Sequence, residues 1–228
     1  MGQNVRVSRV NRTTAAASLS VSFTVGLYGV AFGATGIAAG FSLIQTCLLS
    51  LLTFSGASQF AVVGVLGSGG TALAGIATAS LLGIRNALYG LRLAPLLRLR
   101  GWRKVAGAQV TIDESTGVAL GQSDLGEEAM KQGFWLTGLG VYFFWNIFTL
   151  LGALGAQAMG DPAAWGLDAA VPAAFLGLVW PRLTNNYEKL LAASALVLSL
   201  LLTPFVAAGI PIISTALLAV AFGWKARS

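Results

Sequence analysis

The sequence predicts an all-α, polytopic integral membrane protein: a helical bundle with about six full crossings plus broken or re-entrant helical segments. Of its 228 residues, 56% are hydrophobic and 10% are charged, and the mean hydropathy is +0.77, which excludes an ordinary soluble domain. Its apolar runs are longer than the alternating segments of about ten residues that form membrane β-barrels. We expect one transmembrane transporter domain over 17–224, with a basic segment (1–16) and a short tail (225–228) in the cytosol.

The crossings are predicted from apolar stretches that approach the length of about 20 residues needed to span a bilayer. In chain order, these stretches are 17–39, 71–92, 134–158, 167–181, 190–204 and 209–224. Two further segments, 41–68 and 105–120, are ambiguous because polar residues interrupt them. The sequence leaves open whether each of the two crosses the membrane or re-enters on the side from which it came.

Basic residues lie almost wholly beside and between the apolar stretches, so we interpret the net charge of +6 as a topology signal and not as a sign of nucleic-acid binding. The positive-inside rule places the cluster from Arg98 to Lys104 in the cytosol, together with the N-terminus and the C-terminus. If 17–39, 41–68 and 71–92 each crossed once, that cluster would lie outside. A re-entrant 41–68 segment removes the conflict.

The middle of 41–68 offers a site for such a break, because small and polar residues follow one another there. We predict two short helices that meet near Ser55, Gly56 and Ser58, with Thr53 and Gln59 beside them. Broken helices in transporters present free backbone groups to a solute, and an amide side chain can donate and accept hydrogen bonds. The alternative is one tilted helix whose small residues only allow close packing.

Two apolar stretches carry small residues on one side. In 17–39 these are glycines at spacings of three and four, which predicts a smooth face that a neighbouring backbone can approach: Gly26, Gly29, Gly33, Gly36 and Gly40. In 71–92 they are Gly75, Ala79, Gly83 and Gly90, and they share their side with Asn86, which we expect to point into the bundle. Arg85 either extends to the cytosolic surface or pairs with a carboxylate, and Asp113 and Glu114 are the candidates.

Other features of the sequence predict no further chemistry. Tryptophans mostly flank the apolar stretches, which favours an interfacial belt formed by Trp135, Trp145, Trp165, Trp180 and Trp224. We find no nucleophile and base at recognisable spacing, no phosphate-binding or dinucleotide-binding loop and no metal-binding cluster. We therefore expect neither an enzyme nor a cofactor.

Five segments in order resemble the AzlC family of branched-chain amino acid permeases: FGATGIAAGFS, FSGASQF, RNALYG, IDESTGVAL and WGLDAAVPAAF. The resemblance covers roughly residues 20–224. It implies the large subunit of a bacterial plasma-membrane exporter of leucine, isoleucine, valine and sometimes methionine. It also implies coupling to an ion or proton gradient and a complex with a small AzlD-type membrane partner.

Position by position, the family's pattern is present in the stretch from Gly56 to Phe60. Of its Arg-His-x-Leu-Tyr-Gly motif, this chain has Arg85, Tyr89 and Gly90, and the acidic pair is present as Asp113 and Glu114. The family commonly has Asp or Asn two positions before that arginine and His directly after it, whereas this chain has Gly83 and Asn86. It contains no histidine at all. A proton carried by histidine is therefore impossible, and in a proton-coupled transporter Asp113 or Glu114 would have to titrate.

We therefore expect a secondary transporter subunit that exports branched-chain or other neutral aliphatic amino acids. Substrate binding is assigned to Thr53, Ser55, Gly56, Ser58, Gln59 and Asn86, and coupling or gating to Arg85, Asp113 and Glu114. Two alternatives remain open at this stage. One is a channel or a transporter for another small solute, and the other is an assembly subunit without its own substrate pathway.

Overall fold

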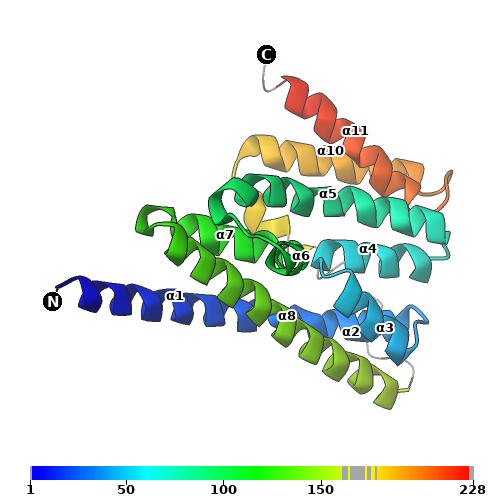
Figure 1. The fold of residues 1–228 in the computed structure, drawn as a ribbon. Helices are drawn as coiled ribbons and strands as arrows, with labels where there is room; N and C mark the ends of the chain where they lie inside the picture. Colours follow the sequence, from blue (N-terminus) through cyan, green and yellow to red (C-terminus); the bar gives the residue numbers. More distant parts are fainter. Residues whose placement is uncertain (1, 161–163, 165–172, 174–175, 178, 226–228) are drawn as a thin grey trace.

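A computed structural model describes residues 2–160, 164, 173, 176–177 and 179–225 (Figure 1). Every regular element in this described part is a helix, which confirms the all-α fold class. Three apolar helical spans are long enough to cross a bilayer: Arg12–Ala38, Ala72–Leu97 and Glu127–Ala158, with 27, 26 and 32 residues. Their lengths and compositions are those of a helical membrane protein.

Helices α1 (Gly2–Gly26) and α2 (Tyr28–Ala38) follow one another as the first crossing, and α8 (Glu127–Ala158) packs along both. Glycines allow this close approach. A side chain at Gly29 or at Gly33 would collide with backbone atoms of α8. The smooth face predicted for the first crossing is therefore confirmed along α8, which is its main neighbour there.

The segment 41–68 is broken, as the charge distribution predicts. Helix α3 (Leu43–Leu52) ends before Thr53, and α4 (Gly56–Gly67) begins after Ser55. Ser58 lies in the first turn of α4, so the break falls slightly earlier than expected. Gly67 lies beside Ala39, because a side chain at Gly67 would meet the Ala39 Cβ at 2.8 Å. The two ends of the segment therefore come together, as in a re-entrant hairpin (Figure 1).

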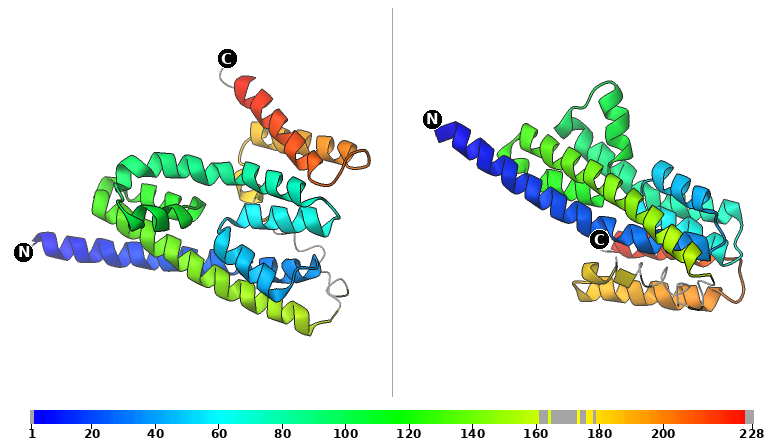
Figure 2. Two further views of the ribbon diagram at one scale, coloured as in Figure 1. Left: turned by 45° about the vertical axis from the view of Figure 1, so that its right-hand side comes forward. Right: turned by 90° about the horizontal axis from the view of Figure 1, so that it is seen from below.

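The segment 105–120 is broken in the same manner. It contains the end of α6 (Trp102–Gln109) and most of α7 (Asp113–Gly121), which are separated by Val110–Ile112. Helix α5 (Ala72–Leu97) leads into this hairpin, and α7 packs on α8. The first hairpin begins and ends near one end of the bundle, and this second hairpin lies toward the other end (Figures 1 and 2). The two breaks meet near the middle of the molecule.

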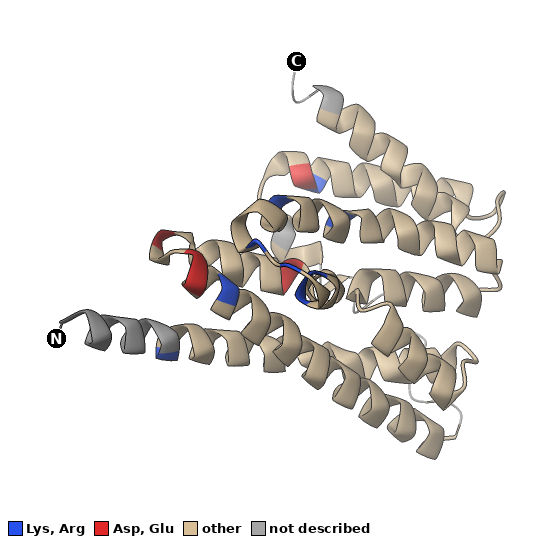
Figure 3. Cartoon of the chain, viewed as in Figure 1, with Lys and Arg blue, Asp and Glu red and all other residues tan. Residues whose placement is uncertain are grey.

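Charged residues gather at one end of the bundle. Figure 3 shows them on the N-terminal part of α1, the C-terminal part of α5, the hairpin of α6 and α7 and the first turns of α8 and α10 (Asn186–Leu202). The first crossing leads away from this end and α5 leads back to it, so the re-entrant α3–α4 hairpin places the basic cluster on the N-terminal side. This is the arrangement that the positive-inside rule favours.

The prediction of about six full crossings is not confirmed by the described residues. Helices α10 and α11 (Ile210–Lys225) have 17 and 16 residues and are shorter than the three long spans. The stretch 167–181 and the segment WGLDAAVPAAF (165–175) lie largely outside the described residues; the short helix η4 (Trp180–Arg182) begins at the end of the stretch 167–181. A further short helix, η1 (Ser123–Leu125), leads into α8.

Two further expectations concern the start of the membrane domain and the position of Trp145. Helix α1 runs unbroken through residue 16, so the structure gives no helix end at the boundary expected between 1–16 and the membrane domain. The expectation of an interfacial Trp145 is wrong, because its side chain is 5% exposed and belongs to the hydrophobic core with Phe32, Phe60 and Val141. Its position near the middle of a long apolar helix is what places it at depth.

Candidate functional site

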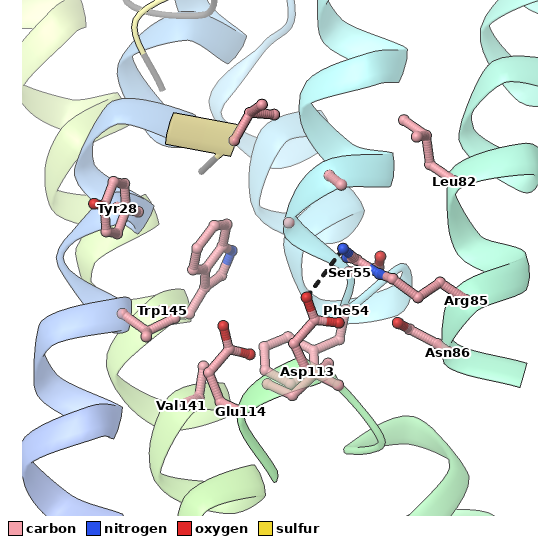
Figure 4. A pocket seen from close by; sticks show the side chains of 15 residues that line it. Tyr28, Phe54, Ser55, Leu82, Arg85, Asn86, Asp113, Glu114, Val141 and Trp145 are labelled. Atoms are coloured by element: carbon pink, nitrogen blue, oxygen red, sulfur yellow. Dashed lines mark ion pairs between the residues drawn. The ribbon is translucent and has the colours of Figure 1, made fainter. Parts of the chain in front are cut away.

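A cavity of about 220 Å³ lies where the two helix breaks meet (Figure 4). Its walls come from both broken hairpins and from α1, α2, α5 and α8, with one contribution from Val179. The cavity is smaller than the roughly 300–1,000 Å³ of pockets for drug-sized ligands, so its dimensions suit a small solute. The lining residues are Val25, Tyr28, Phe54, Ser55, Gly56, Ala57, Leu82, Arg85, Asn86, Ile112, Asp113, Glu114, Val141, Trp145 and Val179.

An ion pair crosses one side of the cavity. Arg85 extends from α5, and its Nη1 lies 3.0 Å from Oδ2 of Asp113, the first residue of α7 (Figure 4). The two side chains are 36% and 18% exposed, so the pair is partly shielded from its surroundings. Glu114 follows Asp113 and lines the cavity too. The expected pairing of Arg85 with a carboxylate is therefore present.

Two buried polar atoms beside this ion pair have no hydrogen-bond partner among the described residues. They are Nε of Arg85, a donor, and Oδ1 of Asn86, an acceptor. Buried polar groups are nearly always hydrogen-bonded, so a pair of such atoms on a cavity wall needs an explanation. A solute that accepts from Arg85 and donates to Asn86 would satisfy both.

Another part of the cavity wall is apolar. Phe54 and Ile112 come from the two breaks, and Val141 and Trp145 come from α8; all four are buried in one hydrophobic cluster. The Trp145 ring stacks near Phe32, with centroids 6.3 Å apart, and its Nε1 donates to Oε1 of Gln59 at 3.0 Å. The ring is thus fixed on two sides. These side chains form a packed apolar surface in the same cavity as the ion pair.

The N-terminus of α4 opens onto the cavity. Ser55 is its N-cap residue, but the side chain makes no capping hydrogen bond and contacts the Ser58 hydroxyl instead, at 3.2 Å. The Ser58 hydroxyl in turn donates to the Ala79 carbonyl of α5 at 2.8 Å. The first N–H groups of a helix have no partner within it, and Gly56 and Ala57 line the cavity. These N–H groups and the positive end of the helix dipole therefore lie next to the cavity.

The C-terminus of α3, on the other side of the break, is closed by side chains. The Ser50 carbonyl accepts from Nε2 of Gln59 at 3.1 Å, and the Leu51 carbonyl accepts from the Tyr142 hydroxyl at 3.2 Å. Nε2 of Gln109 lies 3.0 Å from the Leu51 carbonyl and 3.3 Å from that of Leu52. The Leu49 carbonyl accepts from the backbone of the C-cap residue at 3.0 Å. The carbonyls of the last three residues of α3 thus accept hydrogen bonds from side chains, and the Leu49 carbonyl keeps its ordinary helical bond.

The structure brings together six of the nine residues that the sequence assigns to the site. Ser55, Gly56, Arg85, Asn86, Asp113 and Glu114 line the cavity. Thr53 caps α3 and is exposed, Ser58 bonds to α5, and Gln59 is fully buried between α3 and α8 with both ends of its amide engaged. These three lie outside the cavity lining.

Sequence reasoning missed the apolar wall and the role of Gln109. Phe54, Ile112 and Trp145 have no polar signal, because apolar residues are common throughout the chain. Gln109 did carry a signal, since an amide within an apolar segment needs a partner just as Gln59 does. No group of three or more metal-binding side chains occurs among the described residues.

Comparison with known proteins agrees with this arrangement. The family model described as AzlC protein matches residues 20–159, which include every cavity-lining residue except Val179. No curated protein and no solved structure matches the chain. The family is associated with membrane transport and is not known for catalysis. The chain belongs to the AzlC family.

Proposed function

We propose that the protein is a secondary transporter subunit that exports neutral aliphatic amino acids, with the branched-chain amino acids as the favoured substrates. The observation that carries the proposal is the cavity itself, which joins two helix breaks, an ion pair and an apolar wall. Discontinuous helices that meet at a central site are typical of secondary transporters.

The polar side of the cavity fits the backbone part of an amino acid. The open N-terminus of α4 and the guanidinium of Arg85 favour a carboxylate, because both are positively charged or positively polarised. The carboxylates of Asp113 and Glu114, with the Asn86 amide oxygen, favour an ammonium group. Groups of opposite character thus line one small cavity, as recognition of a zwitterion requires.

The apolar side fits the substrate side chain. Phe54, Ile112, Val141 and Trp145 are held in a packed cluster and present no charged group to the cavity. A branched aliphatic side chain would bury its apolar surface against this wall. The wall disfavours charged side chains, because they would lose their hydration without gaining a partner.

Coupling would involve the Arg85–Asp113 ion pair. A proton or a cation that neutralises Asp113 weakens the attraction to Arg85, which ties α5 to the start of α7. The resemblance to the AzlC family also favours a small AzlD-type partner and the bacterial plasma membrane, with both chain ends in the cytosol. The charged end of the bundle would then face the cytosol.

Transport of labelled leucine, valine and methionine in vesicles tests the proposal. We expect gradient-dependent flux of all three when this chain is present with a small AzlD-type membrane protein, and little flux with this chain alone. Flux whose rate does not depend on the imposed ion gradient would indicate a channel. Equal flux in vesicles that lack the protein would refute a transport role for the site.

A further inference from the structure

A second concave site, which we call the groove, lies at the charged end of the bundle. It is an open depression of about 760 Å³ between the α5–α6 connection and the first turns of α8. Its rim carries Arg98, Arg100, Arg103 and Lys131, and two tryptophans, Trp102 and Trp135, stand beside them. The right-hand view in Figure 2 shows the α5–α6 region projecting from the bundle at this end.

The positive charge of the groove is only partly balanced by the protein. Lys131 pairs with Glu127 at 2.7 Å and with Glu128 at 3.3 Å, and the contact between Arg98 and Glu127 is long, at 4.0 Å. Arg100 and Arg103 form no ion pair with any residue in the described part of the chain. The groove therefore retains two cations that an anionic ligand could contact.

The backbone at Arg98 adds an independent observation. This residue ends α5 in the left-handed conformation, with φ 49°, and no other residue except glycine in the described part has a positive φ. Glycine adopts this conformation without the steric cost that a side chain incurs. Arg98 incurs this cost. Its side chain is 74% exposed and lies at the rim of the groove.

Below the rim, the groove continues into an apolar surface. Leu97, Leu99 and Leu136 line it. Leu136 begins a row of exposed apolar side chains that repeats every three or four residues along α8 and therefore follows one face of the helix: Leu136, Leu139, Phe143, Ile147, Leu150 and Leu154. Such a row is the surface that acyl chains cover in a bilayer. Exposed Trp102 and Val105 lie at the level of the rim on α6.

We propose that the groove binds an anionic phospholipid, such as phosphatidylglycerol. Its phosphate lies among Arg98, Arg100 and Arg103, and its acyl chains run along the exposed face of α8. Basic pockets next to membrane-spanning helices are suited to anionic headgroups, and tryptophan favours the same interfacial depth. The continuity of cationic rim and apolar face distinguishes a lipid from a soluble anion, which needs only the rim.

The test uses the full chain in phosphatidylcholine vesicles with and without phosphatidylglycerol, followed by mass spectrometry of the lipids that the extracted protein retains. We expect the wild type to retain phosphatidylglycerol preferentially. The variant Arg100→Gln/Arg103→Gln should lose about thirtyfold of that preference, since each basic residue contributes about fivefold near an anionic surface. Lys104→Gln is the matched control, because Lys104 is exposed on α6 but does not line the groove.

Two further arms separate a lipid site from a phosphate site. Glycerol 3-phosphate, the soluble part of the headgroup, should not displace the retained lipid, and Leu139→Gln should weaken retention because it interrupts the apolar face. Thermal unfolding in phosphatidylcholine alone should be the same for all variants, which excludes misfolding. The proposal is overturned if the double arginine variant retains the lipid as the wild type does, or if glycerol 3-phosphate displaces it.

Discussion

At the first break, the C-terminus of α3 and the N-terminus of α4 differ in whether side chains bind their terminal backbone groups. The carbonyls of the last three residues of α3 accept hydrogen bonds from the side chains of Gln59, Gln109 and Tyr142. The N-terminus of α4, a few residues away, has no side-chain cap and faces the cavity. The hydrogen bonds favour a structural role for the carbonyl end, and the function that we propose assigns substrate binding to the amide end. Hydrogen bonds thus hold the C-terminus of α3, while the N-terminus of α4 stays accessible from the cavity.

The largest effect is expected at the ion pair beside the open end. Asp113→Asn removes the charge that holds Arg85, and hydrogen bonds to charged groups contribute roughly 1.5–3 kcal/mol, so flux should fall at least about tenfold. Efflux of labelled leucine from vesicles measures this, with protein levels checked by immunoblot. Asp124→Asn, in the short helix η1 away from the cavity, is the control. Near-normal efflux in Asp113→Asn would remove that residue from the mechanism.

A smaller and selective effect is expected at Gly56, the first residue of α4. A methyl group there would lie 3.0 Å from Cη2 of Trp145, so Gly56→Ala narrows the cavity between the open helix end and the apolar wall. One methylene changes discrimination by about tenfold or more, and the loss should be greater for leucine than for valine. Relative efflux rates of the two substrates measure it. Gly155→Ala, whose methyl group meets nothing within 4 Å, should leave the ratio unchanged.

At the closed end, Gln59→Ala should act mainly on stability. It leaves the Ser50 carbonyl and the Trp145 indole N–H without partners at a fully buried position, and each such group costs roughly 1–3 kcal/mol. Thermal unfolding of the purified protein should therefore occur several degrees lower, with flux reduced in proportion to the folded protein. Gln122→Ala, at a partly buried helix end, serves for comparison. Unchanged unfolding together with abolished flux would indicate direct substrate contact by Gln59.

The smallest effects are expected from Tyr142→Phe and Gln109→Ala taken singly. Each removes one of two donors to the Leu51 carbonyl, and the other donor remains. Gln109→Ala also removes the donor to the Leu52 carbonyl, but Leu52 is exposed, so either change should cost about 1 kcal/mol. The double variant removes both donors and should cost more than the sum of the single changes. Thermal unfolding of the four proteins completes this cycle. Strict additivity would show that the two donors do not share a role in closing α3.

Several features of the fold and the site are readable from sequence because they follow from chain-local physics. Apolar composition predicted the membrane bundle, and counting charges at successive loops predicted the re-entrant break in 41–68 before any contact was visible. Glycine spacing predicted the face that α8 approaches. The small residues around Asn86 correctly placed it on the inner side of α5, where it lines the cavity. Each of these inferences needs only the order of residues along one segment.

The roles of Gln59 and Gln109 depend on contacts between distant segments. Two amides within apolar surroundings need partners, but the sequence does not say whether a partner is a solute or a carbonyl at the end of another helix. The fold brings α3, α6 and α8 to the same break, and their groups take up the amides. Trp145 was likewise predicted to be interfacial, but its side chain belongs to the hydrophobic core.

The sequence by itself determined that the chain has the composition of a membrane protein, and it predicted that the basic residues share one end and that a helix breaks within 41–68, with one tilted helix as the alternative. These features follow from the free-energy cost of placing charged groups and unpaired backbone groups in hydrocarbon. This cost applies to each segment independently of the others. Only the tertiary structure decided which end of the break is closed and which faces the cavity. That choice depends on hydrogen bonds between segments up to 91 residues apart, such as Tyr142 to Leu51, and no local pattern encodes them.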